Sequence, residues 1–202
     1  MATKTSKRQK TYELALYAML TALIIVMTFT PVGYITTPTL SVTLIHLPVI
    51  IAAVTLGPKG GTLTGAVWGI TCLIKAFVAP PSPIDGLLFR NPLVSVFPRV
   101  LAGFAAGVIF WAISKSGRNT KAALGSGLAA LGGALTNTVV TLSLIYILYH
   151  DALEIQGVSV GGLGRWMWAI AGVNAPIEIA AAVVLAVPVS VAVRRVMAKQ
   201  RT

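Results

Sequence analysis

The distribution of lysine and arginine among apolar segments constrains this chain more than any other feature of its sequence. Six long apolar stretches alternate with polar connections, and twelve of the 16 cationic residues lie in the two tails or in alternate connections. Those twelve are Lys4, Lys7, Arg8, Lys10, Lys59, Lys115, Arg118, Lys121, Arg194, Arg195, Lys199 and Arg201. The other connections hold Asp85, Asp151 and Glu154 and carry little positive charge. Because cationic residues concentrate in the cytoplasmic loops of membrane proteins, this pattern predicts six spans with both termini in the cytoplasm.

Each apolar stretch is expected to cross the membrane as an α-helix, because lipid cannot satisfy the hydrogen-bonding groups of an open backbone. One crossing needs about 20 residues. We expect a single all-α transmembrane domain over residues 1–202, with helices at residues 12–29, 43–56, 60–78, 92–113, 122–149 and 166–193. Glycine and proline separate these segments, as they do at Gly57-Pro58.

The composition indicates a multi-pass protein of the cell membrane. Hydrophobic residues make up 56% of the sequence and charged residues 10%, whereas a soluble domain carries about 25% charged residues. The net charge of +11 is interpreted as contact between juxtamembrane residues and anionic membrane lipid. Nucleic acid is therefore not expected as a partner.

The sequence contains no motif of an enzyme or of an ATP-driven motor. Residues 57–61 (GPKGG) are glycine-rich but lack the P-loop spacing, so they are read as a turn between two helices. His46 and His150 are isolated, and no cluster of cysteine and histidine resembles a metal site. We expect neither an enzyme nor a bound metal or cofactor.

A few polar residues lie inside or at the edge of the apolar segments, where such groups are costly and are usually functional. They are Lys75, Arg99, Asn137, Asn174 and Glu178, accompanied by His46 and by Trp68, which lies seven residues before Lys75. With a rise of about 1.5 Å per residue, all of them fall in the outer half of the predicted bundle. The sequence therefore predicts a pocket that opens to the outside, and two cations against one acid favour an anionic ligand.

Each of these residues also has a structural interpretation that the sequence leaves open. Lys75 and Arg99 can extend to the outer interface, and Glu178 can pair with one of them. The asparagines can bond neighbouring helices, His46 can bond backbone beside Pro48, and Trp68 can serve packing alone.

Residues 31–42 form a long uncharged connection on the predicted outer side, rich in threonine, proline and glycine. This segment is interpreted either as a lid over the pocket or as a solvated loop. Small residues at four-residue spacing, including Gly61, Gly65 and Gly69, are interpreted as seams where helices pack closely. Ala18 and Ala22 have the same spacing. For their side of the first helix, the sequence does not decide between packing inside the protein and contact with another protein.

Four stretches together resemble a known family. They are residues 18–22 (AMLTA), 41–51 (SVTLIHLPVII), 56–61 (LGPKGG) and 65–69 (GAVWG). The chain resembles the substrate-binding S components of energy-coupling factor (ECF) vitamin transporters over essentially its whole length. Residues 41–61 are most similar to the pantothenate-specific members.

The resemblance implies a subunit that captures a vitamin from outside and delivers it with the help of partners. Those partners are a transmembrane T component and two cytoplasmic ATPases, and the resemblance assigns the contact with the T component to Ala18 and Ala22. Pantothenate fits the predicted pocket: Arg99 would hold its carboxylate, Asn137 and Asn174 its amide and hydroxyls, and Trp68 its dimethyl group. The alternatives are another vitamin, such as riboflavin, or a small proton-coupled transporter that uses Glu178.

Overall fold

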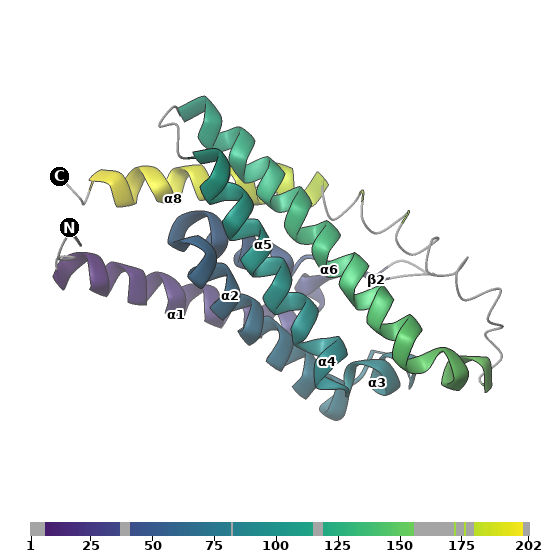
Figure 1. The fold of residues 1–202 in the computed structure, drawn as a ribbon. Coiled ribbons are helices and arrows are strands. Elements are labelled where there is room, and N and C mark those ends of the chain that lie inside the picture. Colours follow the sequence, from purple (N-terminus) through teal and green to yellow (C-terminus); the bar gives the residue numbers. More distant parts are fainter. Residues whose placement is uncertain are drawn as a thin grey trace.

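The fold is known from a computed structural model, which describes residues 7–36, 41–81, 83–114, 119–155, 172, 176 and 180–199. The described chain is almost wholly helical (Figure 1). Its α-helices are α1 (Lys7–Phe29), α2 (His46–Val78), α3 (Pro83–Phe89), α4 (Pro92–Ser95), α5 (Phe97–Ser114), α6 (Asn119–Ile155) and α8 (Val187–Lys199). A π-helical turn, η2 (Ala182–Ala186), leads into α8.

Helix α2 is a helical hairpin with its bend at Gly57. This glycine has φ 79° and ψ −170°, a backbone conformation that residues with a Cβ atom rarely adopt, and Pro58 follows it. Beyond the bend the chain turns back, since a Cβ on Gly61 would lie 2.8 Å from the Cβ of Ala53. The two arms, residues 46–56 and 58–78, match the separate helices that the sequence predicts at 43–56 and 60–78.

The second arm of α2 packs against α5 with the backbones in direct contact. A Cβ on Gly61 would lie 2.2 Å from the carbonyl oxygen of Gly103, and a Cβ on Gly65 would lie 2.3 Å from that of Arg99. Such approach is possible only without side chains at these positions. The predicted small-residue seam is therefore an internal contact, and it fixes the start of α5 beside the middle of the second arm.

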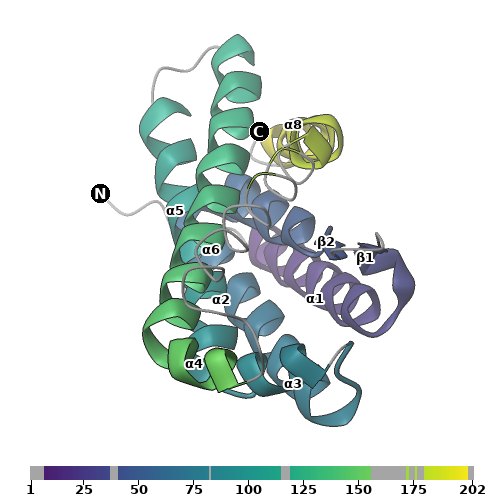
Figure 2. The same cartoon turned by 90° about the vertical axis from the view of Figure 1, so that its right-hand side faces the viewer.

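The bundle is layered around α2, with α1 on one side, α5 on the other, and α6 packed outside α5 (Figure 2). The main apolar core joins Leu16 and Leu20 of α1 to Ile50 of α2 and Phe110 of α5. A second cluster joins Ile24 of α1 to Trp68 of α2. Each helix thus buries one stripe and leaves the opposite stripe exposed, as expected of spans that face lipid.

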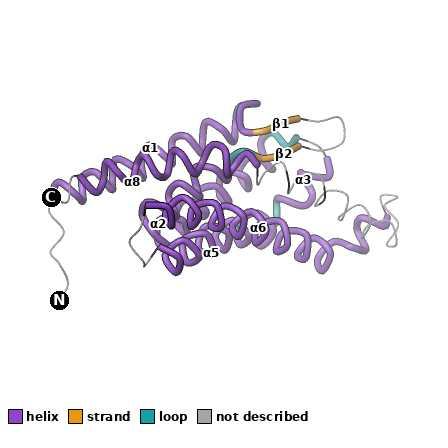
Figure 3. The backbone as a smooth tube through the Cα atoms, turned by 90° about the horizontal axis from the view of Figure 1, so that it is seen from above, coloured by secondary structure: helices purple, strands orange, loops and turns teal. Residues whose placement is uncertain are grey.

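The connection after α1 differs from the all-α expectation, because it holds a short antiparallel hairpin. A 3₁₀ turn, η1 (Pro31–Gly33), precedes β1 (Tyr34–Thr36) and β2 (Ser41–Thr43), and Ile35 pairs with Val42. The hairpin is anchored at the helix end, where Leu44 N donates to the Gly33 carbonyl oxygen at 2.8 Å. It lies at the end of the bundle opposite the end of α8 (Figure 3).

Two predicted helices have different bounds in the structure. The helix expected at residues 92–113 is divided at Val96, because Pro98 lacks an N–H and restricts the residues before it. Helix α4 begins instead at the Asn91 cap, whose side chain accepts from Leu93 N. Helix α6 is longer than the predicted 122–149, and much of the span expected at 166–193 lies outside the described residues.

Helix α1 begins and α8 ends at the same end of the bundle (Figure 1). At this end Arg194 Nη1 of α8 donates to Ser114 Oγ of α5 at 3.2 Å, and its guanidinium lies 4.4 Å from the centre of the Phe110 ring. The bend of α2 is here too, since a Cβ on Gly107 would lie 2.4 Å from Pro58 Cα. The cations that the sequence assigns to one membrane side therefore share one end wherever the structure describes them.

Within the described ranges, four helical segments are long and apolar enough to cross a membrane: Gln9–Phe29, His46–Val78, Pro92–Ser114 and Ala123–Tyr149. The second is the bent α2, whose two arms run in opposite directions.

Candidate functional site

A small cavity lies between the two arms of α2, α5 and α6. Its enclosed part is only about 10 Å³, room for roughly one water molecule, and about 270 Å³ when the open solvent beside it is counted. Its lining residues are His46, Val49, Ile50, Trp68, Ala102, Gly133, Ala134 and Asn137. Three residues that the sequence assigns to the substrate site, from three separate segments, therefore meet around one space.

Small residues of α5 and α6 leave the room for this cavity. Ala102 and Ala134 are buried, and a Cβ on Gly133 would lie 3.3 Å from the Ala102 carbonyl oxygen. The larger apolar side chains of the lining, Val49 and Ile50, come from the first arm of α2. The cavity therefore has a mainly apolar wall with a few polar groups, which is the usual composition of a small-molecule site.

Trp68 and Asn137 bring buried polar atoms to this wall. Trp68 is 2% exposed, and its indole Nε1 has no hydrogen-bond partner among the described residues. The Oδ1 atom of Asn137 is likewise buried without a partner in the described part of the chain. Buried polar atoms normally find partners, because leaving one unpaired costs about 1–3 kcal/mol. Both of these atoms belong to residues that line the same cavity.

Arg99 is buried beside residues that line the cavity. It is 7% exposed, and its guanidinium lies 5.4 Å from the ring centre of Trp68 and 5.0 Å from that of Phe89. Its Nη1 donates to the Val94 carbonyl oxygen. Ala102, one turn further along α5, lines the cavity itself. The arginine thus adds positive charge next to the aromatic wall.

His46 bonds the backbone before α2 and also lines the cavity. Its Nδ1 lies 2.7 Å from the carbonyl oxygen of Thr43, and a carbonyl only accepts, so Nδ1 donates. The same side chain lines the cavity and is 6% exposed. Thr43 is the last residue of β2, so His46 connects the hairpin directly to the cavity wall.

Lys75 is not among the cavity residues. Its Nζ donates to the Thr28 carbonyl oxygen at 2.7 Å, in the last turn of α1. The hydroxyls of Thr28 and Thr71 lie 3.2 Å apart beside this bond. A lysine that donates to the last carbonyls of a helix stabilises that helix end, so this geometry favours a structural role for Lys75.

Two predicted residues, Asn174 of the substrate site and the neighbouring Glu178, lie outside the described residues. The sequence reasoning missed Thr141, which follows Asn137 by one turn on the same face of α6. Thr141 is 8% exposed, and its hydroxyl has no partner among the described residues. The four-residue spacing from Asn137 places it on the same helix face, but the spacing alone does not show that its hydroxyl is unpaired.

Comparison with known proteins gives the family of the chain. Residues 13–190 match the family described as ECF transporter, substrate-specific component. The chain belongs to the ECF S components. It is therefore a subunit of a transporter rather than an enzyme, and a multi-pass protein of the cell membrane, as the sequence predicts.

Two curated relatives of this S component cover about the same part of it. The pantothenic acid transporter PanT of Lactococcus lactis subsp. cremoris is 31% identical over 155 residues, which are 71% of this chain and 72% of that protein. The pantothenate transporter PanT of Leuconostoc mesenteroides subsp. mesenteroides is 34% identical over 149 residues, which are 71% of this chain and 70% of that protein.

A solved structure confirms the S-component fold. The crystal structure of the S component for biotin from an ECF-type ABC transporter has a TM-score of 0.61 to this chain, with 96% of this chain and 94% of that one covered. Sequence identity is 19%, so this likeness concerns the fold alone.

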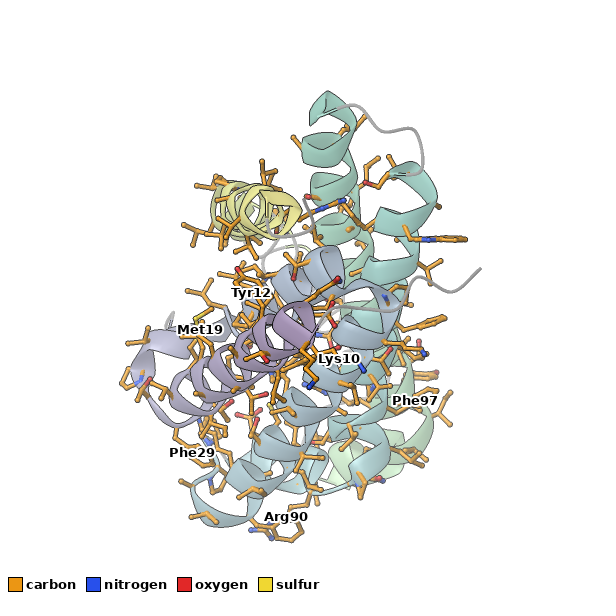
Figure 4. All side chains as sticks on the ribbon, turned by 90° about the vertical axis from the view of Figure 1, so that its left-hand side faces the viewer. Lys10, Tyr12, Met19, Phe29, Arg90 and Phe97 are labelled. Carbon is orange, nitrogen blue, oxygen red and sulfur yellow. The ribbon has the colours of Figure 1, made fainter. Side chains whose placement is uncertain are left out.

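The predicted partner contact lies on an open face of the S component. Ala18 and Ala22 are exposed on α1, whereas Leu16 and Leu20 of the same helix are buried. Met19, which is 58% exposed, projects outward from this helix (Figure 4). Two exposed alanines one turn apart have small side chains, which let another helix approach closely.

Proposed function

We propose that this S component captures pantothenate in the cavity between α2, α5 and α6. The observation that carries the proposal is the cavity itself, where Trp68, Asn137 and His46 meet next to a buried Arg99. The two relatives named as pantothenate transporters, at 31% and 34% identity, support the choice of vitamin.

The chemistry of pantothenate matches this set of side chains. The molecule has one carboxylate, one amide, two hydroxyls and a dimethyl carbon. In the proposed complex Arg99 binds the carboxylate through parallel N–H groups, and Asn137 and Asn174 bind the amide and hydroxyl groups. The dimethyl carbon packs against Trp68 and the apolar wall formed by Val49 and Ile50.

We further propose a single domain of six spans with both termini in the cytoplasm. The bend of α2, the end of α5 and the end of α8 share one end of the bundle, and the cations of their connections follow the positive-inside distribution. The hairpin and the cavity residue His46 then face the outside, where the vitamin enters. The basic end would contact anionic lipid of the inner leaflet, and nucleic acid is not proposed as a partner.

The proposed partners are a transmembrane T component and two cytoplasmic ATPases. The exposed Ala18 and Ala22 of α1 supply the contact, because small residues let helices of two subunits approach closely. The S component would thus bind the vitamin by itself and depend on these partners for delivery.

A binding measurement on the purified S component tests the proposal. Calorimetry should detect pantothenate and should find no binding of biotin or riboflavin under the same conditions. Arg99→Ala should lower the affinity at least tenfold, since a buried charged hydrogen bond is worth about 1.5–3 kcal/mol. The matched control is Arg90→Ala: Arg90 also lies over an aromatic ring, at 5.3 Å from the centre of Phe77, but is exposed. Equal binding by wild type and Arg99→Ala would contradict the assignment of Arg99.

A further inference from the structure

Two residues that line the cavity each carry one buried polar atom without a hydrogen-bond partner among the described residues. The donor is the indole Nε1–H of Trp68 and the acceptor is Oδ1 of Asn137, and both atoms are buried without partners in the described part of the chain. Since each lacks a partner, the two are not bonded to each other, although both residues line the same space. An indole N–H can only donate, and an amide oxygen can only accept.

The two atoms come from different helices. Trp68 belongs to the second arm of α2, whereas Asn137 belongs to α6. A ligand that pairs with both atoms must therefore accept one hydrogen bond and donate another. Val49, Ile50 and Ala102 of the lining are apolar, and the polar neighbours are His46, which lines the same space, and Cys72, which packs in the same cluster as Trp68.

A secondary amide meets this requirement. Its group is planar and trans, so the C=O and the N–H point in opposite directions. A carboxylate has no proton to donate and would leave Asn137 Oδ1 facing a second acceptor. An ester keeps the carbonyl but lacks the N–H, so it satisfies Trp68 and leaves Asn137 unpaired.

We propose that Trp68 and Asn137 form an amide-recognition pair: Trp68 Nε1–H donates to the amide carbonyl oxygen of the substrate, and Asn137 Oδ1 accepts from its amide N–H. This inference rests on the proposed function, because pantothenate is the amide-containing ligand. It assigns Trp68 a polar role in addition to packing, and it makes the amide, rather than the carboxylate alone, a determinant of specificity.

The test compares pantothenate with its ester analogue, in which oxygen replaces the amide N–H. Wild-type protein should bind the amide about 10–100-fold more tightly, because the ester leaves a buried acceptor unpaired. In Asn137→Leu, which has no acceptor, this preference should fall to within about threefold. Trp68→Phe keeps an aromatic ring but loses the N–H, so it should weaken binding of amide and ester equally, by about tenfold.

Matched variants separate these effects from general damage. Trp111→Phe changes an exposed tryptophan of α5, and Thr136→Val removes a hydroxyl that bonds only the Gly132 carbonyl oxygen of its own helix. Both should leave the affinities and the amide preference unchanged. Thermal unfolding of each variant shows whether it is folded.

The possible outcomes distinguish this inference from the proposed function. If wild-type protein fails to bind pantothenate, both the proposed function and the amide-recognition pair are wrong. If wild-type protein binds the amide and the ester equally well, or if Asn137→Leu keeps the full preference, the vitamin assignment stands and the amide pair is wrong. The comparison of amide and ester on wild-type protein needs no variant. Equal binding of the two would therefore contradict the amide-recognition pair even where Asn137→Leu does not fold.

Discussion

The guanidinium of Arg99 lies 5.4 Å from the ring centre of Trp68, so a buried cation on α5 contacts the aromatic wall of the cavity on α2. This pairing depends on how closely the two helices approach. At Gly65, one turn before Trp68, a Cβ would lie 2.3 Å from the carbonyl oxygen of Arg99 itself. The glycine seam and the candidate site are therefore parts of one arrangement.

Gly65→Ala should damage both stability and vitamin binding. The added methyl group meets backbone, which cannot turn aside, so α2 and α5 must separate. We expect a loss of about 1–3 kcal/mol in the free energy of unfolding, as for other overpacked sites. Binding should weaken as well, because Trp68 and Arg99 move apart. Thermal unfolding in detergent and calorimetry with pantothenate measure the two effects.

Gly127→Ala is the control for that substitution. Gly127 also lies within a helix, but a Cβ there would meet nothing within 4 Å. Alanine favours helix over glycine by about 0.8–1 kcal/mol, so this variant should be as stable as wild type or more so. If Gly65→Ala behaved like Gly127→Ala, the backbone contact would not hold the site together.

The sequence predicts which helices meet at the site, because depth along a helix follows from residue count. His46, Trp68 and Asn137 were expected at similar depth and do line one cavity. Lys75 was expected at that depth too, but depth does not decide where a long side chain turns. Its ammonium bonds the Thr28 carbonyl oxygen at the end of α1, a partner visible only once the helices are packed.

Thr141 could not be recognised from the sequence for a different reason. Threonines in membrane helices usually bond a carbonyl of their own helix, and Thr55, Thr62 and Thr64 do so here. Nothing in the sequence shows that the hydroxyl of Thr141 has no such bond. The hairpin was missed as well, because strands of three residues are too short to show an alternating pattern in the sequence.

Lys75→Met should reveal the structural role of this lysine. The substitution keeps the length of the side chain and removes the donor to the α1 carbonyl, so we expect a loss of about 1 kcal/mol in stability. The affinity for pantothenate should change less than threefold. Lys59→Met, at an exposed position beside the bend of α2, should change neither quantity. A large loss of affinity at unchanged stability would instead place Lys75 in the substrate site.

Bulky residues on the open face of α1 should block assembly without affecting capture. Leucine at Ala18 or Ala22 remains compatible with lipid. Its larger side chain should prevent the close approach of a helix of the T component that is proposed at this face. Co-purification with a T component and its ATPases should fall at least tenfold, while the isolated subunit keeps its affinity for pantothenate. Ala112→Leu, at an exposed position of α5, should assemble normally. Normal assembly of both α1 variants would move the contact to another face.

The bond between His46 and the hairpin should govern how long the vitamin stays bound. His46 lines the cavity, and its Nδ1 donates to Thr43 at the end of β2, so its loss removes the hydrogen bond that joins the cavity wall to the hairpin. His46→Leu should therefore speed dissociation of radiolabelled pantothenate about tenfold, corresponding to roughly 1.4 kcal/mol. His46→Asn carries its amide nitrogen on Cγ, as histidine carries Nδ1, and should restore slow dissociation. If both variants released the vitamin at the same rate, the hydrogen bond to Thr43 would not hold the hairpin, and residues 31–42 would be a solvated loop.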